Sequence, residues 1–242
     1  MAKVQHLSRA PVVEAVIALQ VRFPEPRSPE CFQDIGRIIK EDYPQQEVRH
    51  QVQVQLDLAG KLDRSHAIEG FLFRNKAGTQ VVQSRQLGFA FSRLAPYENW
   101  ERMEAEAMRL WNIYCGELRP ESLARVAVRF INRLHLPPPP IDFDDYLAAG
   151  PRLPEGELSL SAFTTSVVMP DAATKTTSIV RQVFESPTEK DVPVILDIDV
   201  IREVQLKADD SPGIQAVLRE LRTVKNKLFF GSLTEKAVEL FV

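Results

Sequence analysis

Hydrophobic and polar residues alternate along several stretches of the chain, a pattern typical of strands that bury one face and expose the other. The longest such stretch covers residues 123–136, close to the midpoint, and four prolines follow it at 137–140. Seven more stretches predict strands, at residues 12–23, 50–58, 67–74, 79–94, 158–168, 177–184 and 192–204. Turn residues separate them, so the pattern favours a mostly antiparallel sheet of about eight strands.

Hydrophobic residues three or four positions apart predict helices between these strands. Ser28–Pro29 and Ser211–Pro212 each place a proline next to a capping residue, which favours a helix start. Asn99 is the candidate N-cap of a third long helix that reaches about Leu118. Aromatic residues recur along this helix; they could line a ligand site, but at helical spacing they are more typical of the core, which is the interpretation we favour.

The predicted order of elements repeats along the chain. Residues 10–118 and 122–229 each give a strand, a helix, three strands and a helix. The expected fold is therefore α+β, with a curved antiparallel sheet, the long helices at 99–118 and 211–229 on one face, and the other face partly exposed. The halves 1–120 and 121–242 are expected to form one compact unit. The shape is similar to duplicated saddle-shaped or helix-grip folds, which by itself carries no function.

Composition adds few constraints. The 242 residues include 44% hydrophobic and 26% charged residues, as in an ordinary globular protein. The net charge of −3 argues against non-specific binding to nucleic acid, which depends on a basic surface. No apolar run approaches the ~18 residues of a membrane span, and the N-terminus lacks the apolar segment of a signal peptide. We therefore expect a cytoplasmic protein that does not bind a membrane.

Few motifs in the sequence specify chemistry. Phosphate-binding loops, the GxSxG motif and zinc-type histidine spacing are all missing from the sequence, and we expect no cofactor. Asp197 and Asp199 stand on one face of a predicted strand, where two carboxylates could hold Mg²⁺. With no third carboxylate at a recognisable spacing, the two aspartates are expected to be solvated or ion-paired.

The longest predicted strand carries a row of arginines. Alternation places Arg125, Arg129 and Arg133 on one face, opposite a face that is almost wholly apolar. We favour a structural interpretation in which these arginines pair with acids of neighbouring strands, such as Asp197 and Asp199. In the alternative, the row binds an anionic ligand or nucleic acid, because guanidinium groups fit carboxylates and phosphates. Arg85 and Arg93 could extend it.

Four short motifs suggest a family. APVVEAVI at 10–17, FSRLAPYENW at 91–100, RFINR at 129–133 and FFGSLTE at 229–235 resemble signatures of a sporadically distributed family of bacterial proteins of about 240–280 residues. The resemblance spans most of the chain and implies a bacterial, cytoplasmic protein. It carries over no activity and no site residue. Patchy distribution is a feature of phage-defence and toxin–antitoxin genes, so the resemblance also suggests a role of that kind.

The function expected from these observations is that of a non-catalytic binding protein that uses an exposed sheet face. Its partner would be another protein or a second copy of itself in a homodimer. A metal-dependent enzyme acting on nucleic acid or nucleotides through Asp197 and Asp199 is one alternative. A nucleic-acid-binding module centred on Arg125, Arg129 and Arg133, with Arg85, is the other.

Overall fold

A computed structural model describes the chain except for residues 1, 57–61, 139–141, 152–159, 185–186 and 188. In the described part, nine strands form one antiparallel sheet, ordered β2-β3-β4-β5-β1-β6-β9-β8-β7, which confirms the expected α+β class. The strands are β1 (Val12–Arg22), β2 (Gln45–Leu56), β3 (Leu62–Arg74), β4 (Gln80–Arg85), β5 (Gly88–Leu94), β6 (Ser122–Leu136), β7 (Phe163–Asp171), β8 (Thr176–Phe184) and β9 (Val192–Lys207). The helices are α1 (Pro29–Ile38), α2 (Trp100–Leu118), α3 (Ser211–Ser232) and α4 (Glu235–Glu239), with a 3-10 turn, η1 (Phe143–Asp145).

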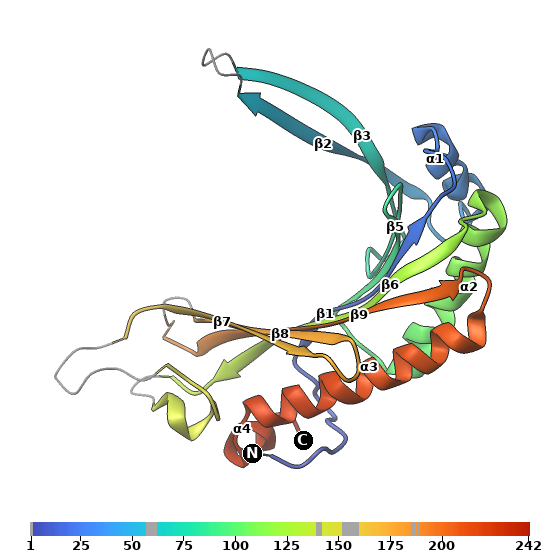
Figure 1. Ribbon diagram of the computed structural model, residues 1–242. Coiled ribbons are helices and arrows are strands. Elements are labelled where there is room, and N and C mark those ends of the chain that lie inside the picture. The colour runs from blue at the N-terminus through green and yellow to red at the C-terminus, as the bar shows by residue number, and fades with distance from the viewer. Residues whose placement is uncertain (1, 57–61, 139–141, 152–159, 185–186, 188) are drawn as a thin grey trace.

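The sheet is strongly curved, and the long helices lie on its convex side (Figure 1). Helix α3 packs on β6 and β9, whereas α1 packs against β3 and β4. No helix of the described residues lies on the concave face, which opens between the β2–β3 arm and the part of the sheet that contains β7 and β8. The long helices therefore cover one face, as the alternating pattern predicts.

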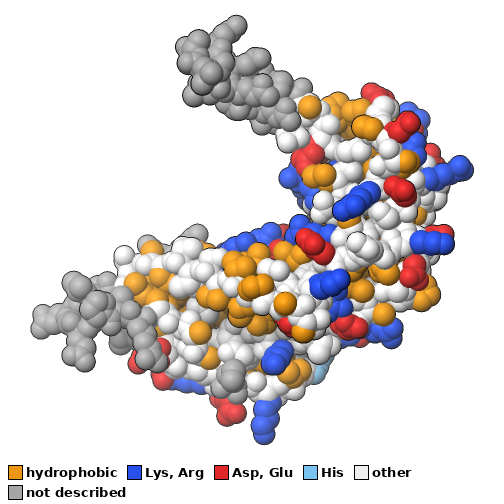
Figure 2. Space-filling model, viewed as in Figure 1, with side chains coloured by type: hydrophobic (Ala, Val, Ile, Leu, Met, Phe, Trp, Pro, Cys, Tyr) orange, Lys and Arg blue, Asp and Glu red, His pale blue; other side chains and the backbone are white. Residues whose placement is uncertain are grey.

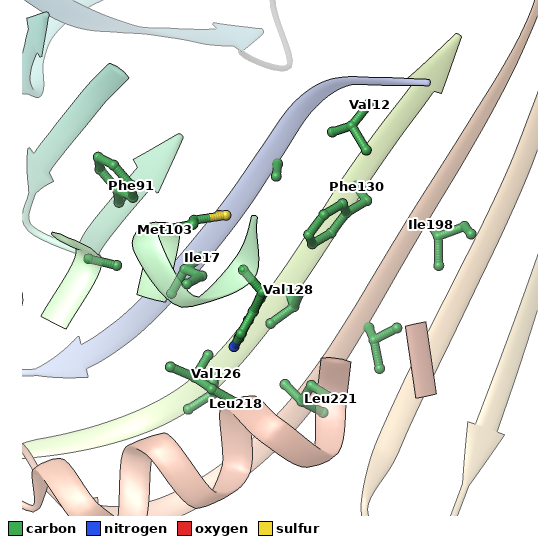
Figure 3. Close-up of a cluster of buried hydrophobic side chains, with 14 of the residues drawn as sticks. Val12, Ile17, Phe91, Met103, Val126, Val128, Phe130, Ile198, Leu218 and Leu221 are labelled. Carbon is green, nitrogen blue, oxygen red and sulfur yellow. The ribbon is translucent and has the colours of Figure 1, made fainter. Parts of the chain in front are cut away.

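The core lies between the convex face and the helices. From Ala15 to Val21 on β1 and from Val126 to Leu136 on β6 every second side chain is buried, and Ile17 lies opposite Val128. Leu218 and Leu221 of α3 approach this layer in Figure 3. The face of each central strand that contacts the helices is apolar because polar groups buried there would lose water without gaining partners.

The helix starts agree with the sequence, with one shift. The Asn99 side chain accepts a hydrogen bond from the Arg102 amide at 2.8 Å and caps α2. For α3 the capping side chain is Asp210, which accepts from the Gly213 amide at 3.0 Å, and Ser211 is already helical. The expected cap at Ser211 is therefore one residue late, because the aspartate before it reaches the free amides of the first turn.

The aromatic residues of α2 belong to the core. The Trp111 and Tyr114 rings are stacked with centroids 5.4 Å apart, and both are fully buried. The Trp111 indole donates to the Ala208 carbonyl at 3.1 Å, which satisfies its buried N–H. Trp100, at the first turn, is also buried, and it borders a cavity on the helix side of the sheet.

The segment predicted as one strand at 79–94 is a hairpin of β4 and β5, so the sheet has nine strands rather than eight. Gln86 and Leu87 form the turn, and Arg85 pairs with Gly88 across it. Gly88, directly after the turn, has φ +139°, a backbone conformation that favours glycine. The first half therefore has four strands after α1, and β1 and β6 bring the two halves together. The internal duplication stays a prediction.

Gly88 gives a direct test of this hairpin. A Cβ at this position would lie 2.1 Å from the Leu19 carbonyl oxygen, so Gly88→Ala forces the backbones of β5 and β1 apart. With the positive φ added, we expect the free energy of unfolding to fall by about 2 kcal/mol or more. A Cβ at Gly116 of α2 meets nothing within 4 Å. Gly116→Ala should instead stabilise the protein by roughly 0.5–1 kcal/mol. Urea titrations that rank the two variants the other way would contradict this picture.

Candidate functional site

The arginines of β6 lie on the concave face, as the alternation predicts. Arg125 and Arg129 are partly buried there, and Arg133 is exposed. Each stands between residues whose side chains point to the core, such as Val128 and Phe130 on either side of Arg129. Since no helix in the described part of the chain covers this face, its polar side chains depend on neighbouring strands and on solvent for partners.

Asp197 of β9 joins two of the concave arginines. The Arg129 guanidinium donates from Nε and Nη2 to the two Asp197 oxygens, both at 2.8 Å. Arg181 of β8 donates to the same carboxylate at 3.2 Å. Asp197 is only 8% exposed, so this fork satisfies a nearly buried carboxylate. The pairing agrees with the structural interpretation for Arg129.

A second cluster lies on the side of the β2–β3 arm. Glu69 of β3 accepts from Arg49 at 2.7 Å and from Arg85 at 3.3 Å. Glu69 reaches the concave face because the β2–β3 register shifts between Arg49 and His50, and β3 bulges there. At Gly70, next to the bulge, a Cβ would lie 2.3 Å from the Ser84 carbonyl, so only glycine fits there without a shift. Each cluster therefore shares one acid between two arginines.

Between the two clusters the concave face forms a pocket of about 470 Å³. Four arginines line it, and the acids in its wall are Glu14 and Asp199. The lining arginines are Arg49, Arg85, Arg125 and Arg129. Figure 2 shows Lys and Arg side chains along the lower wall of the hollow between the β2–β3 arm and the part of the sheet that contains β7 and β8. We call this site the arginine pocket.

Two of these arginines keep unused donors in the arginine pocket. The Nε atoms of Arg85 and Arg125 are buried and have no hydrogen-bond partner. Arg125 also makes no ion pair with any acid in the described ranges, although its charge influences Asp199. A buried donor without an acceptor costs free energy. The arginine pocket therefore has cationic donors that an anionic ligand would satisfy.

Asp199 also lines the arginine pocket, and its negative charge would repel an anionic ligand. Burial raises the pKa of its carboxyl, and the charge of Asp197 adds to that shift. Arg129 and Arg125 act in the opposite direction but do not offset the loss of water. An anion bound near Asp199 would favour its protonated form still further.

The two aspartates do not form a metal site with other ligands. Asp197 is engaged by two arginines, whose charge opposes a cation. Across the residues that the structure describes, no three His, Cys, Asp or Glu side chains come together to hold an ion. The metal interpretation of Asp197 and Asp199 stays a prediction without further support.

Arg93 does not join the concave row. Arg85 and Arg93 are eight residues apart, and a continuous strand would put both on one face. The turn at Gln86 and Leu87 places them on opposite faces instead. Arg85 pairs with Gly88 and shares its face, and Arg93 lies an odd number of residues after Gly88. Arg93 points to the helix side, where it binds Glu98 at 2.8 Å. The expectation for Arg93 is therefore wrong, whereas Arg85 lies in the arginine pocket.

Three contributors to this face escaped the sequence reasoning. Arg49 and Glu69 lie in strands whose pairing is shifted by the bulge, and Arg181 lies on β8 beside Asp197. Arg181 shares its face of β8 with Ile179 and Val183, so the alternation of this strand gave no clear signal that Arg181 lies beside Asp197. The expected alternation along 50–58 rests partly on residues outside the described ranges.

Comparisons with protein-family models, with curated proteins and with solved structures find no match. No described helix is both long and apolar enough to cross a membrane. The arrangement of the site therefore has to be interpreted from its own geometry.

Asp197→Ala tests whether the shared acid stabilises the fold. Two arginines would lose their partner, but they are 43% and 37% exposed, so solvent limits the penalty. We expect the free energy of unfolding to fall by roughly 1–2 kcal/mol. The control is Asp34→Ala, which removes the surface pair with Arg37 and should cost less than about 0.5 kcal/mol. Equal effects in urea titrations would show that the fork contributes no more than a surface pair.

Asp199→Asn should stabilise the protein at pH 7. Because the folded-state pKa of Asp199 is raised above 3.8, the folded state holds the proton in a range where the unfolded state releases it. Stability then falls as pH rises through this range, and the asparagine removes that loss. The gain should shrink as the pH is lowered toward 4. Asp171→Asn is the control of opposite sign, since hydrogen bonds from Thr174 and Ala173 lower the pKa of Asp171. A destabilised Asp199→Asn at pH 7 would refute this assignment.

Proposed function

We propose that this protein is a non-catalytic binding protein whose concave sheet face holds an anionic group of its ligand in the arginine pocket. The observation that carries the proposal is Arg125, whose buried Nε has no acceptor and whose guanidinium has no paired acid in the described ranges. An arginine in this state is a vacant donor for a phosphate or a carboxylate, the groups that its planar fork fits.

The composition of the arginine pocket supports an anion rather than an apolar ligand. Its four arginines outnumber its two acids, and Asp197 and Glu69 outside it neutralise only part of the charge. The other lining groups are small or polar, such as Ala18, Ser92 and Gln83. A volume of about 470 Å³ lies within the usual range for small-molecule sites. The site thus suits a small anion or one anionic group of a larger partner.

Nucleic acid is the second candidate, and the continuation of the row favours it. Arg133 is exposed on the same face beyond the arginine pocket, so cationic side chains follow β6 along the hollow. Against this, Glu14, Asp197 and Asp199 interrupt the row, and a phosphate backbone would pass close to them. We therefore rank it below a single anionic group.

A protein partner or a homodimer remains compatible with the same site, since a partner carboxylate could enter it. The role in phage defence or toxin–antitoxin biology stays an expectation from the family resemblance. Neither adds to the chemistry of the arginine pocket.

The test is the affinity of Arg125→Gln for defined anions. Calorimetry with pyrophosphate, citrate and a 20-nucleotide single-stranded DNA would separate phosphate, carboxylate and nucleic-acid binding. A charge-assisted hydrogen bond contributes roughly 1.5–3 kcal/mol, so Arg125→Gln should weaken binding of the preferred anion by roughly 10- to 100-fold.

Arg133→Gln is the matched control, because Arg133 lies on the same strand and face but does not line the arginine pocket. It should change the affinity for a small anion by less than about twofold. Asp199→Asn should tighten binding, since it removes a like charge. Binding of DNA alone, with a steep salt dependence and equal losses in the two arginine variants, would favour the nucleic-acid alternative. If none of the three anions binds, the proposal fails.

A further inference from the structure

A second cavity, of about 500 Å³, lies on the helix side of the sheet. Its walls come from the N-terminal segment at 4–12, the start of α2, β6 and α3. Aromatic rings form much of the lining, from Tyr97, Trp100, Phe130, Phe229 and Phe230. Val12 and Phe130, both labelled in Figure 3, lie on neighbouring strands at its sheet side. The sheet separates this aromatic cavity from the arginine pocket.

Lys225 is half-buried on α3 and borders the aromatic cavity. The buried face of α3 runs through Leu218, Leu221 and Phe229, and Lys225 lies four residues after Leu221 and four before Phe229. An apolar residue would continue this stripe. The Lys225 Nζ instead lies 4.0 Å from the centre of the Phe130 ring. The amine is therefore held against an aromatic face at the wall of the cavity.

The charged groups around the aromatic cavity leave Lys225 without an acidic partner in the described ranges. Glu98 binds Arg93 and Arg102, and Glu101 binds Arg222 at 3.0 Å. Arg222, one turn before Lys225, lies over the Trp100 ring and adds a like charge. His6 and Tyr97 are the other titratable groups in the lining.

These surroundings weaken the charged form of the amine. Burial, and then the charge of Arg222, lower the pKa of Lys225 to about 7. At neutral pH about half of the side chain is then a neutral amine, whereas a lysine in water, with a pKa near 10.4, is almost wholly protonated. Removal from water and a neighbouring cation are the two conditions that make a lysine nucleophilic.

We propose that Lys225 is a nucleophilic amine that captures a small aldehyde or ketone with an apolar body in the aromatic cavity. The Nζ lone pair attacks the carbonyl carbon, an N–C bond forms, and the carbonyl electron pair moves to oxygen, which takes a proton. Loss of this hydroxyl with a proton from nitrogen releases water and leaves an imine. No oxidant or reductant is required.

The geometry distinguishes this role from a purely structural lysine. A long side chain at the edge of a core usually extends its ammonium into water. At Lys225 the ammonium lies instead over Phe130, at the wall of a cavity large enough for a ring compound. The Phe130 ring holds the protonated side chain against the wall of the cavity and opposes the effect of burial on its pKa. The aromatic lining suits the apolar body of the carbonyl compound.

Benzaldehyde with borohydride trapping tests the proposal, with peptide mass spectrometry to locate the modified lysines. Lys227 is the internal control, because it lies on the same helix and is exposed. At pH 7 we expect Lys225 to be modified at least about tenfold faster than Lys227, since the neutral fraction is roughly a thousandfold larger for a pKa near 7 than near 10.4. Its rate should level off above about pH 7.

Two variants separate reactivity from folding. Lys225→Met should lose the adduct while leaving that of Lys227 unchanged. Arg222→Gln removes the like charge, so modification of Lys225 at pH 7 should slow several-fold in a protein that keeps its lysine. Modification of Lys225 no faster than that of Lys227, or a rate that keeps rising to pH 10, would overturn the proposal. An unchanged rate in Arg222→Gln would do the same for the part assigned to Arg222.

Discussion

The antiparallel pairing of β1 with β6 is the interaction on which the rest of the structure depends. Its register places Ile17 opposite Val128 on one face and Val16 opposite Arg129 on the other. A slip by one residue would turn the apolar set toward the open face and the arginines toward the helices. Because the long helices cover only the convex face, this one register determines both where the core forms and where the polar site lies.

The uncovered face explains the pattern of ion pairs. Asp197 and Glu69 each serve two arginines, and these clusters leave Arg125 between them without a paired acid in the described ranges. The arginines of these pairs are partly exposed, so the pairs contribute only modestly to stability and do not explain why arginines gather here. Burial of Asp199 even opposes folding at neutral pH. The proposed anionic ligand would use this surplus of cations, which adds little to the stability of the fold.

The sequence predicts what depends on local periodicity. Alternation along 123–136 places Arg125 and Arg129 on one face, and the structure agrees. Features that depend on pairing between strands could not be predicted from the sequence. The turn at Gln86 and Leu87 has no Asn-Gly or Asp-Gly signal, so the reversal of Arg93 could not be foreseen. The bulge that turns Glu69 toward Arg49 likewise exists only once β2 meets β3. Lys225 carries no signal of its own in the sequence, because a single lysine in an amphipathic helix is expected on the solvent face.

Strand β6 contributes to both cavities through adjacent residues. Arg129 points into the arginine pocket, and Phe130 points into the aromatic cavity. Successive side chains of a strand face opposite sides, so ligands at the two sites never share space. A ligand at one site could change binding at the other only if β6 moved. Antiparallel ladders to β1 and β9 hold both edges of β6. A strand held in this way shifts only by breaking many hydrogen bonds together, so ligands at the two proposed sites would be expected to bind independently.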